Sequence, residues 1–225
     1  MSQAATGNVS DIVERQVSAG RGGATAFIAP DATLTYDALR SQVNRAGHLL
    51  RDLGVRREQR VLLVLDDSTV FPIAFLGAIR IGAVPVPVSH LDKDDNFRHF
   101  VDDSYAEVIV TDAGVLDRIR DALGERSVRY LVRGRDEPGV IEFDAAMAVQ
   151  PDELDAVPTH RDDMAFWLYS SGSTGKPKGV VHLQHDISVT CENYAGGVLG
   201  LRSDDIHFST TKLFHAYGLG NGLTF

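Results

Sequence analysis

The feature that most constrains the fold is an alternation of short apolar runs with helical segments. Strand-length runs are RVLLVL (60–65), EVIVTD (107–112) and RYLV (129–132). Between them lie segments whose apolar side chains recur at three- and four-residue steps, as they do in helices. Strands that alternate with helices of about ten to fifteen residues indicate βαβ units and a mostly parallel sheet. The sequence therefore predicts an α/β fold, with layered βαβ sheets and helices on both faces.

The expected helices have recognisable ends. Residues 34–54 have helical periodicity, and Gly54 supplies a C-terminal cap. The next helix follows Thr69 or Ser68, because either side chain can cap it. Two further helices are expected at 92–104, with a polar composition, and at 114–123.

Two stretches interrupt the alternation. AVPVPV (83–88) is extended, and its two prolines should keep it in a loop or at an edge of the sheet. Residues 133–163 carry three prolines and many acids, so we expect a surface connector. AFWLYS (165–170) then begins a new strand. We divide the chain into an N-terminal segment (1–24), a first βα-alternating subdomain (25–160) and the start of a second subdomain (161–225).

Composition limits the class of protein and its partners. The 44% apolar and 24% charged residues are ordinary for a globular protein, and the net charge of −9 argues against non-specific nucleic-acid binding. The apolar stretch 70–91 carries Arg80 and three prolines, which disfavours a membrane span. A single cysteine, Cys191, excludes an intrachain disulfide and is expected to pack in a helix. With a polar N-terminus, this predicts a cytoplasmic protein.

The most unusual segment is YSSGSTGKPKG (169–179), which lies between apolar runs. It holds four hydroxyl groups besides that of the tyrosine, three glycines and two lysines. Hydroxyls, ammonium groups and the backbone N–H groups that glycine exposes all favour polyphosphate binding. A Walker A loop is excluded, because Pro177 follows Gly175 and Lys176 and a strand-like run, VVHL (180–183), comes next. The alternative is a solvated hairpin turn, which the same residue types favour.

YSSGSTGKPKG resembles the phosphate-binding signature of the adenylate-forming superfamily, which includes acyl- and aryl-CoA ligases. Segments 34–68, 75–88 and 212–225 agree, so the resemblance covers the chain from about Thr25 onward. WLYSSGSTGKPKGVVH together with KLFHAYGLGN looks most like benzoate-CoA ligases. The resemblance implies an N-terminal part of the large domain of such an enzyme, with a loop that clamps the β- and γ-phosphates of ATP. The residues that it assigns to this clamp are Ser170, Ser171, Gly172, Ser173, Thr174, Gly175, Lys176 and Lys178.

The resemblance also implies a reaction in two steps. A carboxylate attacks the α-phosphorus of ATP to give an acyl adenylate and pyrophosphate, and the coenzyme A thiol then displaces AMP. The implied partners are ATP, coenzyme A and a small carboxylic acid resembling benzoate, with Mg²⁺ as a cofactor that travels with ATP. Neither step needs a protein nucleophile, so catalysis would depend on positioning and charge stabilisation. No metal site is predicted, because His182 and His185 have no third ligand nearby.

The second informative segment is KLFHAYGLGN (212–221). By position, His215 matches the family residue beside the reacting carboxylate and is the predicted catalytic residue. The benzoate branch more often has an aromatic residue there, which leaves the exact acid open. Without the resemblance, Phe214, His215 and Tyr217 would be interpreted as core residues at a helix start. The residues expected to contact the acid are Ala216, Tyr217 and Gly218.

The family pattern continues beyond these 225 residues. It includes an adenine-binding segment with a magnesium-binding glutamate, a ribose-binding aspartate and a small C-terminal lid domain. We therefore expect a truncated second subdomain, weak ATP binding at best and no thioester formation by this chain alone. The apolar stretch 213–225 is expected to be exposed and to favour homo-oligomers. Two alternatives stay open: an adenylation module that loads a carrier protein, and a fragment that binds nucleotide without catalysis.

Overall fold

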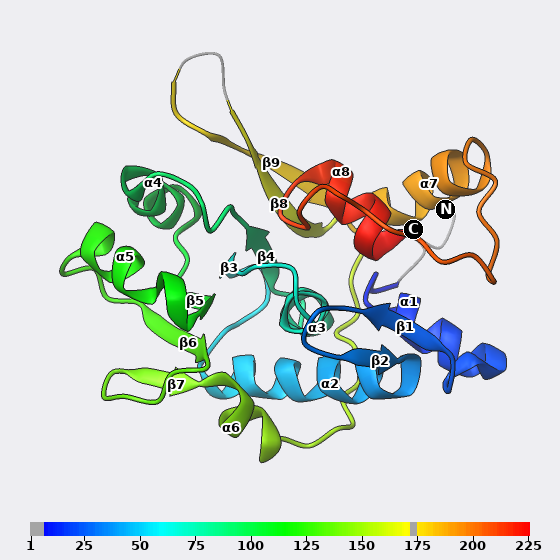
Figure 1. Cartoon of the computed structure of the whole chain (residues 1–225), viewed down its shortest axis with the longest axis horizontal. Coiled ribbons are helices and arrows are strands. Elements are labelled where there is room, and N and C mark those ends of the chain that lie inside the picture. Colours follow the sequence, from blue (N-terminus) through cyan, green and yellow to red (C-terminus); the bar gives the residue numbers. More distant parts are fainter. Residues whose placement is uncertain (1–6, 172–174) are drawn as a thin grey trace.

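A five-stranded parallel sheet organises the protein, whose computed structural model describes residues 7–171 and 175–225 (Figure 1). The strand order is β4-β3-β5-β6-β7. All these strands are parallel, but the order in which successive strands are added reverses at β3, because β4 pairs on one side of β3 and β5 on the other. This confirms the predicted α/β fold. The strands are β3 (Arg60–Val64), β4 (Val84–Pro87), β5 (Val108–Asp112), β6 (Arg129–Arg133) and β7 (Val140–Glu142).

Helices cover both faces of the sheet, as predicted (Figure 1). On one face, Leu63 of β3 packs in a cluster with residues of α2 (Tyr36–Asp52), α3 (Val70–Arg80) and α6 (Phe143–Ala148). On the other face, Leu62 packs with residues of α4 (Asp94–Ser104) and α5 (Ala113–Leu123). Burial of both faces explains why the strands read as continuous apolar runs.

The segment 133–163 is more than the surface connector that we predicted. It contains β7, which is the last strand of the sheet, and α6, whose Phe143 and Met147 are buried. The Glu142 side chain caps α6 by accepting from the backbone N–H of Ala145. Periodicity missed both elements, because a strand of three residues and a helix of six are too short to show it.

Thr69 directly precedes α3, but the prediction that its side chain caps this helix is wrong. The side chain that binds the start of α3 belongs to a residue far away in the sequence. Thr69 has helical backbone angles, and its side chain makes no capping bond. Instead, the carboxylate of Asp31 accepts from the Thr69 N–H at 3.1 Å and from its hydroxyl at 2.6 Å. Asp31 follows the strand β1 (Thr25–Ile28), which pairs with β2 (Thr33–Thr35). A carboxylate from another segment therefore does the work of a local cap.

The proline-containing strand β4 lies at the edge of the sheet, as predicted. It is nevertheless buried, because β8 (Met164–Ser170) lies against it. β8 pairs in antiparallel fashion with β9 (Lys178–Leu183). Figure 1 shows this hairpin extending past the sheet, with its far end above α4.

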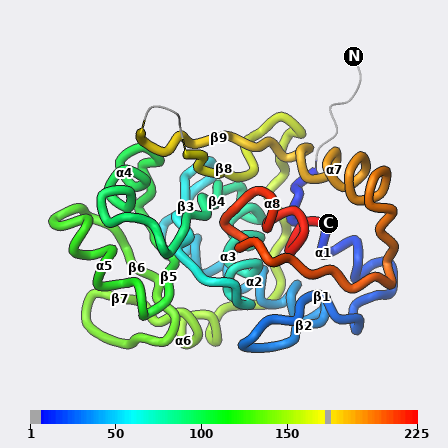
Figure 2. The backbone as a smooth tube through the Cα atoms, turned by 45° about the horizontal axis from the view of Figure 1, so that its top comes forward, coloured from blue at the N-terminus to red at the C-terminus, as the bar shows by residue number. Residues whose placement is uncertain are grey.

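The remaining short helices lie at the two ends of the chain. Figure 2 shows the C-terminal residues returning to lie near α1 (Asp11–Gln16). The prediction of an exposed stretch at 213–225 is wrong in part, because Leu213, Phe214 and Leu219 are buried. The most exposed large apolar side chains of this half of the chain come earlier, at Ile206 and Phe208. The other elements here are η1 (Val17–Arg21), α7 (Asp186–Thr190), η2 (Cys191–Gly196), α8 (Ala216–Leu219) and η3 (Gly220–Thr224).

None of the helices in residues 7–171 and 175–225 has both the length and the apolar character that a membrane crossing requires.

Candidate functional site

The predicted phosphate loop connects β8 to β9. Tyr169 pairs with Gly179 and Ser170 with Lys178, so the two ends of the loop lie side by side on neighbouring strands. Gly175 has a φ of 100°, which favours glycine. The predicted ligands Gly172, Ser173 and Thr174 lie outside the described residues. The other predicted ligands, Ser170, Ser171, Gly175, Lys176 and Lys178, are all exposed, as binding of a phosphate from solution requires.

The segment before α8 is fixed to the carboxyl ends of the sheet strands. The Lys212 ammonium lies 2.6 Å from a carboxylate oxygen of Asp66, which follows β3. The backbone N–H of Leu213 donates to Asp67 at 3.0 Å. The Asp66 N–H in turn donates to the carboxylate of Asp112, at the end of β5, at 3.0 Å. We call Asp66, Asp67 and Lys212 the carboxyl-edge clamp.

The carboxylates of this region differ in their electrostatics. Burial raises the pKa of Asp66, but the hydrogen bond from Lys212 and the Asp67 N–H outweigh it, so the pKa lies below its usual value. The hydrogen bond to Asp66 also raises the pKa of Lys212, which stabilises the charged pair. Asp112 is different, because burial raises its pKa by more than the hydrogen bond from the Asp66 N–H and the charge of Arg133 lower it. The folded protein therefore disfavours the charge of Asp112.

The predicted acid-binding residues lie at the start of α8. His215, Ala216 and Tyr217 are exposed, so the alternative that His215 and Tyr217 belong to the core is wrong. That alternative holds for Phe214, which is buried and packs edge-on against His90, with 5.8 Å between the ring centres.

Gly218 is buried, unlike its neighbours in the predicted acid-binding set. A Cβ at this position would lie 2.0 Å from the carbonyl oxygen of Lys212, so α8 needs glycine to approach the preceding backbone. Through this close approach, the carboxyl-edge clamp and α8 are parts of one small unit.

The predicted acid-binding residues lie together, but the predicted phosphate loop lies apart from them. His215 directly precedes α8 and is consecutive with Ala216 and Tyr217, whereas the loop is at the far end of the β8–β9 hairpin (Figures 1 and 2). Among the described residues, no hydrogen bond joins the loop directly to the segment 212–218. Each part instead contacts the body of the protein separately.

The carboxyl-edge clamp was missed by the sequence analysis, although a signal existed. Asp66 and Asp67 directly follow a predicted strand, and Asp112 ends another. The carboxyl ends of parallel strands meet at one edge of a sheet, and ligand sites of α/β folds lie there beside the point where strand order reverses. What the sequence could not supply was the partner, Lys212, which is 146 residues away.

Comparisons with known proteins decide the family. The sequence matches the AMP-binding enzyme family over residues 13–225. The chain belongs to this family. It is 42% identical to the benzoate–CoA ligase of Thauera aromatica and 41% identical to the 4-hydroxybenzoate–CoA/benzoate–CoA ligase of Rhodopseudomonas palustris. These matches cover 96% and 95% of this chain but only 41% and 40% of the two relatives, so the chain spans about two fifths of their length.

Solved structures agree with the family assignment. A benzoate CoA ligase from Burkholderia xenovorans LB400 superposes with a TM-score of 0.89 at 35% identity, covering 97% of this chain and 43% of that one. An anthranilate CoA ligase in complex with anthranoyl-AMP gives a TM-score of 0.90 at 31% identity, covering 96% of this chain and 42% of that one. The predicted fold of an N-terminal portion of an adenylate-forming CoA ligase is therefore confirmed.

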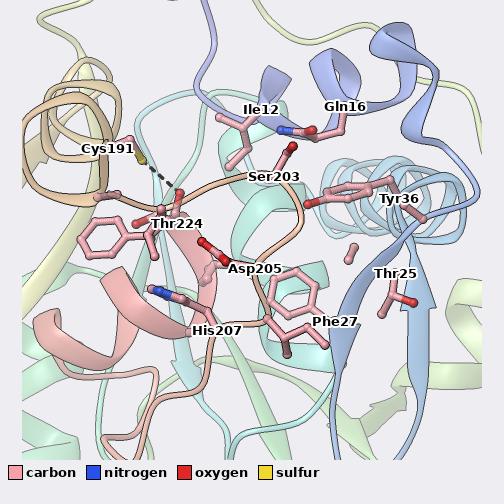
Figure 3. Close-up of a pocket in the computed structure, with 18 of the residues that line it drawn as sticks. Ile12, Gln16, Thr25, Phe27, Tyr36, Cys191, Ser203, Asp205, His207 and Thr224 are labelled. Atoms are coloured by element: carbon pink, nitrogen blue, oxygen red, sulfur yellow. Dashed lines mark hydrogen bonds between the residues drawn. The ribbon is translucent and has the colours of Figure 1, made fainter. Parts of the chain in front are cut away.

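A cavity in this member of the AMP-binding enzyme family lies away from the described residues of the predicted site (Figure 3). It has a volume of about 620 Å³ and lies between α1, β1 and the C-terminal segments. Cys191 lies in its wall, where its thiol donates to the Thr224 carbonyl at 3.1 Å and burial raises its pKa. The prediction that Cys191 packs in a helical segment is confirmed. Among the residues that the structure describes, none of those predicted to contact phosphate or acid lines this cavity.

Proposed function

We propose that the protein is an AMP-forming acid–CoA ligase that activates an aromatic acid of about the size of benzoate. The observation that carries this proposal is the 42% identity to a benzoate–CoA ligase over 96% of the chain. The chain corresponds to two fifths of that enzyme, so the activity is proposed for the full-length protein. Relatives named as 3-hydroxybenzoate–CoA and anthranilate–CoA ligases support the same substrate class.

In the first step, the carboxylate of the acid attacks the α-phosphorus of ATP, and the bond to the pyrophosphate leaving group breaks. The leaving group carries the negative charge that develops. Lys176 and Lys178 are exposed at the two sides of Pro177, where their ammonium groups can neutralise this charge. The hydroxyls of Ser170, Ser171, Ser173 and Thr174 and the backbone at Gly172 and Gly175 complete the proposed phosphate clamp.

The acid is proposed to lie against the start of α8. His215 would stand beside the reacting carboxylate, and its exposure leaves the imidazole accessible. Tyr217 is 63% exposed and offers a flat surface to an aromatic ring, while the small side chain of Ala216 leaves room beside it. The carboxyl-edge clamp attaches the residues before α8 to the end of β3.

In the second step, the thiol of coenzyme A attacks the acyl carbon and AMP leaves. Coenzyme A as acceptor is supported by the names of the relatives. Mg²⁺ is proposed to enter with ATP as its counter-ion. In the described residues, no group of three or more His, Cys, Asp and Glu side chains is placed to hold a metal ion, so we derive no step through it. A cytoplasmic location belongs to the proposal, because ATP and coenzyme A are required as substrates.

Formation of the thioester by the full-length protein tests this proposal. We expect benzoyl-CoA and AMP to form in equal amounts from benzoate, ATP and coenzyme A, and palmitate to react much more slowly. Ala216→Leu should lower kcat/KM for benzoate by about five- to a hundredfold, because overpacking a filled pocket costs about 1–3 kcal/mol. A protein that prefers palmitate, or that loses no activity with Ala216→Leu, would contradict the proposed pocket.

A further inference from the structure

We propose that helix α4 positions the phosphate loop, with His99 and Asp103 as the positioning residues. This inference rests on the proposed function, because it assigns α4 a role in ATP handling. Neither residue belongs to the loop, the carboxyl-edge clamp or the proposed acid pocket. Both contact the hairpin at the point where the loop begins and ends.

The first contact is made to Pro177, the loop residue directly before β9. The Nε2 atom of His99 lies 2.7 Å from the carbonyl oxygen of Pro177. A carbonyl oxygen only accepts, so the proton is on Nε2 and the imidazole donates. Pro177 has no N–H, and the β8–β9 ladder ends at the next residue, Lys178. His99 therefore holds the backbone between the two lysines of the proposed clamp.

The second contact is made to the strand that enters the loop. The hydroxyl of Tyr169 donates to the Asp103 carboxylate at 2.7 Å. Burial, followed by this hydrogen bond to Asp103, raises the pKa of Tyr169 far above its usual value, so the hydroxyl stays protonated as a donor. The Tyr169 ring packs against Phe100, with 4.6 Å between the ring centres. His99 and Asp103 are four residues apart and share one face of α4.

The helix that makes these contacts is itself firmly attached to the sheet. Phe97 and Phe100 are buried in the core between α4, α5 and the strands. At its end, Asp102 accepts from two nitrogens of Arg126, both at 2.7 Å. Near its start, Asp94 accepts from Arg118 at 2.8 Å. The buried phenylalanines thus join α4 to the sheet, and the two carboxylates join it to α5 and to the segment after α5, so α4 can serve as a support.

The hairpin needs such a support because its own packing near the loop is poor. The first four residues of β9 are exposed, including Val180 and Val181. A two-stranded hairpin alone is marginally stable in water. Contacts from α4 to Tyr169 in β8 and to Pro177 directly before β9 fix the direction in which the loop leaves the hairpin, and with it the position of Lys176 and Lys178.

The test separates positioning from a general loss of stability. In the full-length protein, His99→Ala should raise the KM for ATP in acid-dependent ATP–pyrophosphate exchange by roughly three- to tenfold, the loss expected for one net hydrogen bond. The KM for the acid should stay unchanged. His99→Gln places an amide N–H near the position of Nε2 and should restore much of the affinity for ATP. Tyr169→Phe, which keeps the ring and loses the donor, should act in the same direction as His99→Ala.

His48 supplies a matched control. His48 lies on α2, far from the hairpin in the sequence, and its Nε2 also contacts a backbone carbonyl oxygen, that of Glu153, at 2.9 Å. His48→Ala should therefore leave the KM for ATP unchanged. An increase in His48→Ala equal to that in His99→Ala, or no increase in His99→Ala, would overturn the proposal.

A second readout does not depend on catalysis. Amide hydrogen exchange at Lys178 and Gly179 should be faster in His99→Ala than in the parent and in His48→Ala, because the end of the ladder loses its support. If the rate of amide hydrogen exchange at these residues did not change in His99→Ala, the proposed role of α4 would be overturned. Parent protein without acid-dependent exchange of pyrophosphate would contradict the proposed function, while the amide measurement would still decide the role of α4.

Discussion

The five-stranded sheet and the β8–β9 hairpin achieve order in different ways. In the sheet, Leu62 and Leu63 are fully buried between helices on opposite faces, so hydrophobic burial adds to the backbone ladder in fixing the strands. In the hairpin, Val180 and Val181 are 45% and 43% exposed. Residues at the start of β8 are buried against β4, but near the loop the hairpin is held by a few polar contacts, such as those of Tyr169 with Asp103 and of His99 with Pro177. The sheet is thus suited to carry the site, and the hairpin to present exposed polar groups such as Lys176 and Lys178 to solvent.

The largest expected effect tests the sheet half of this comparison. Leu62→Ala should destabilise the protein by about 2–5 kcal/mol, because it removes a fully buried side chain and leaves a cavity. Val181→Ala in the hairpin should change the free energy of unfolding by about 0.5 kcal/mol or less. Urea unfolding measures both. Equal losses in the two variants would show that the hairpin is packed as tightly as the sheet.

The next largest effect tests the hairpin through the rate of adenylation by the full-length protein. Lys178→Ala should slow adenylation roughly ten- to several-hundred-fold, since one charged donor to the leaving pyrophosphate is lost. Its free energy of unfolding should change little, because the side chain is exposed. Lys93→Ala, which removes an exposed lysine just before α4, is the matched control and should keep the parental rate. Parental adenylation in Lys178→Ala would remove this lysine from the phosphate clamp.

The carboxyl-edge clamp joins the sheet to the segment that we propose binds the acid, and its removal should have an intermediate effect. Asp67→Ala removes the acceptor for the Leu213 N–H and should raise the KM for the acid by roughly three- to tenfold. Asp67→Asn keeps an oxygen acceptor and should recover much of this loss. Asp95→Ala, at an exposed position of α4, is the control. A KM for the acid that does not change in Asp67→Ala would show that α8 keeps its position without the clamp.

The smallest expected effect concerns Asp112, where the sheet meets the site. Burial raises the pKa of Asp112, so its contribution to stability is present below its usual value of 3.8 and is lost as the pH rises through the folded value. Asp112→Asn cannot ionise, yet it keeps an acceptor for the Asp66 N–H. The stability of this variant relative to the parent should therefore increase between about pH 4 and about pH 7. Urea unfolding at both pH values measures the difference, and a constant or decreasing difference would contradict the assignment.

The same contrast explains what the sequence could predict. The runs RVLLVL and EVIVTD predicted buried parallel strands because burial on both faces leaves a local signal. The loop was recognisable because its ligands are consecutive in the chain. By contrast, the bonds from Asp31 to Thr69 and from His99 to Pro177 join residues 38 and 78 positions apart. Such contacts leave no periodic pattern, so the supports of the site became visible only in the structure.

Acid-dependent ATP–pyrophosphate exchange by the full-length protein tests the central claim most directly. This reaction reports adenylate formation without the coenzyme A step, and it requires both the phosphate loop and the acid pocket. We expect exchange to depend on benzoate and to fall at least roughly tenfold in Lys178→Ala but not in Lys93→Ala. Exchange that is absent with every aromatic acid, or that proceeds equally well without acid, would contradict the assignment of these residues to an acid-activating enzyme.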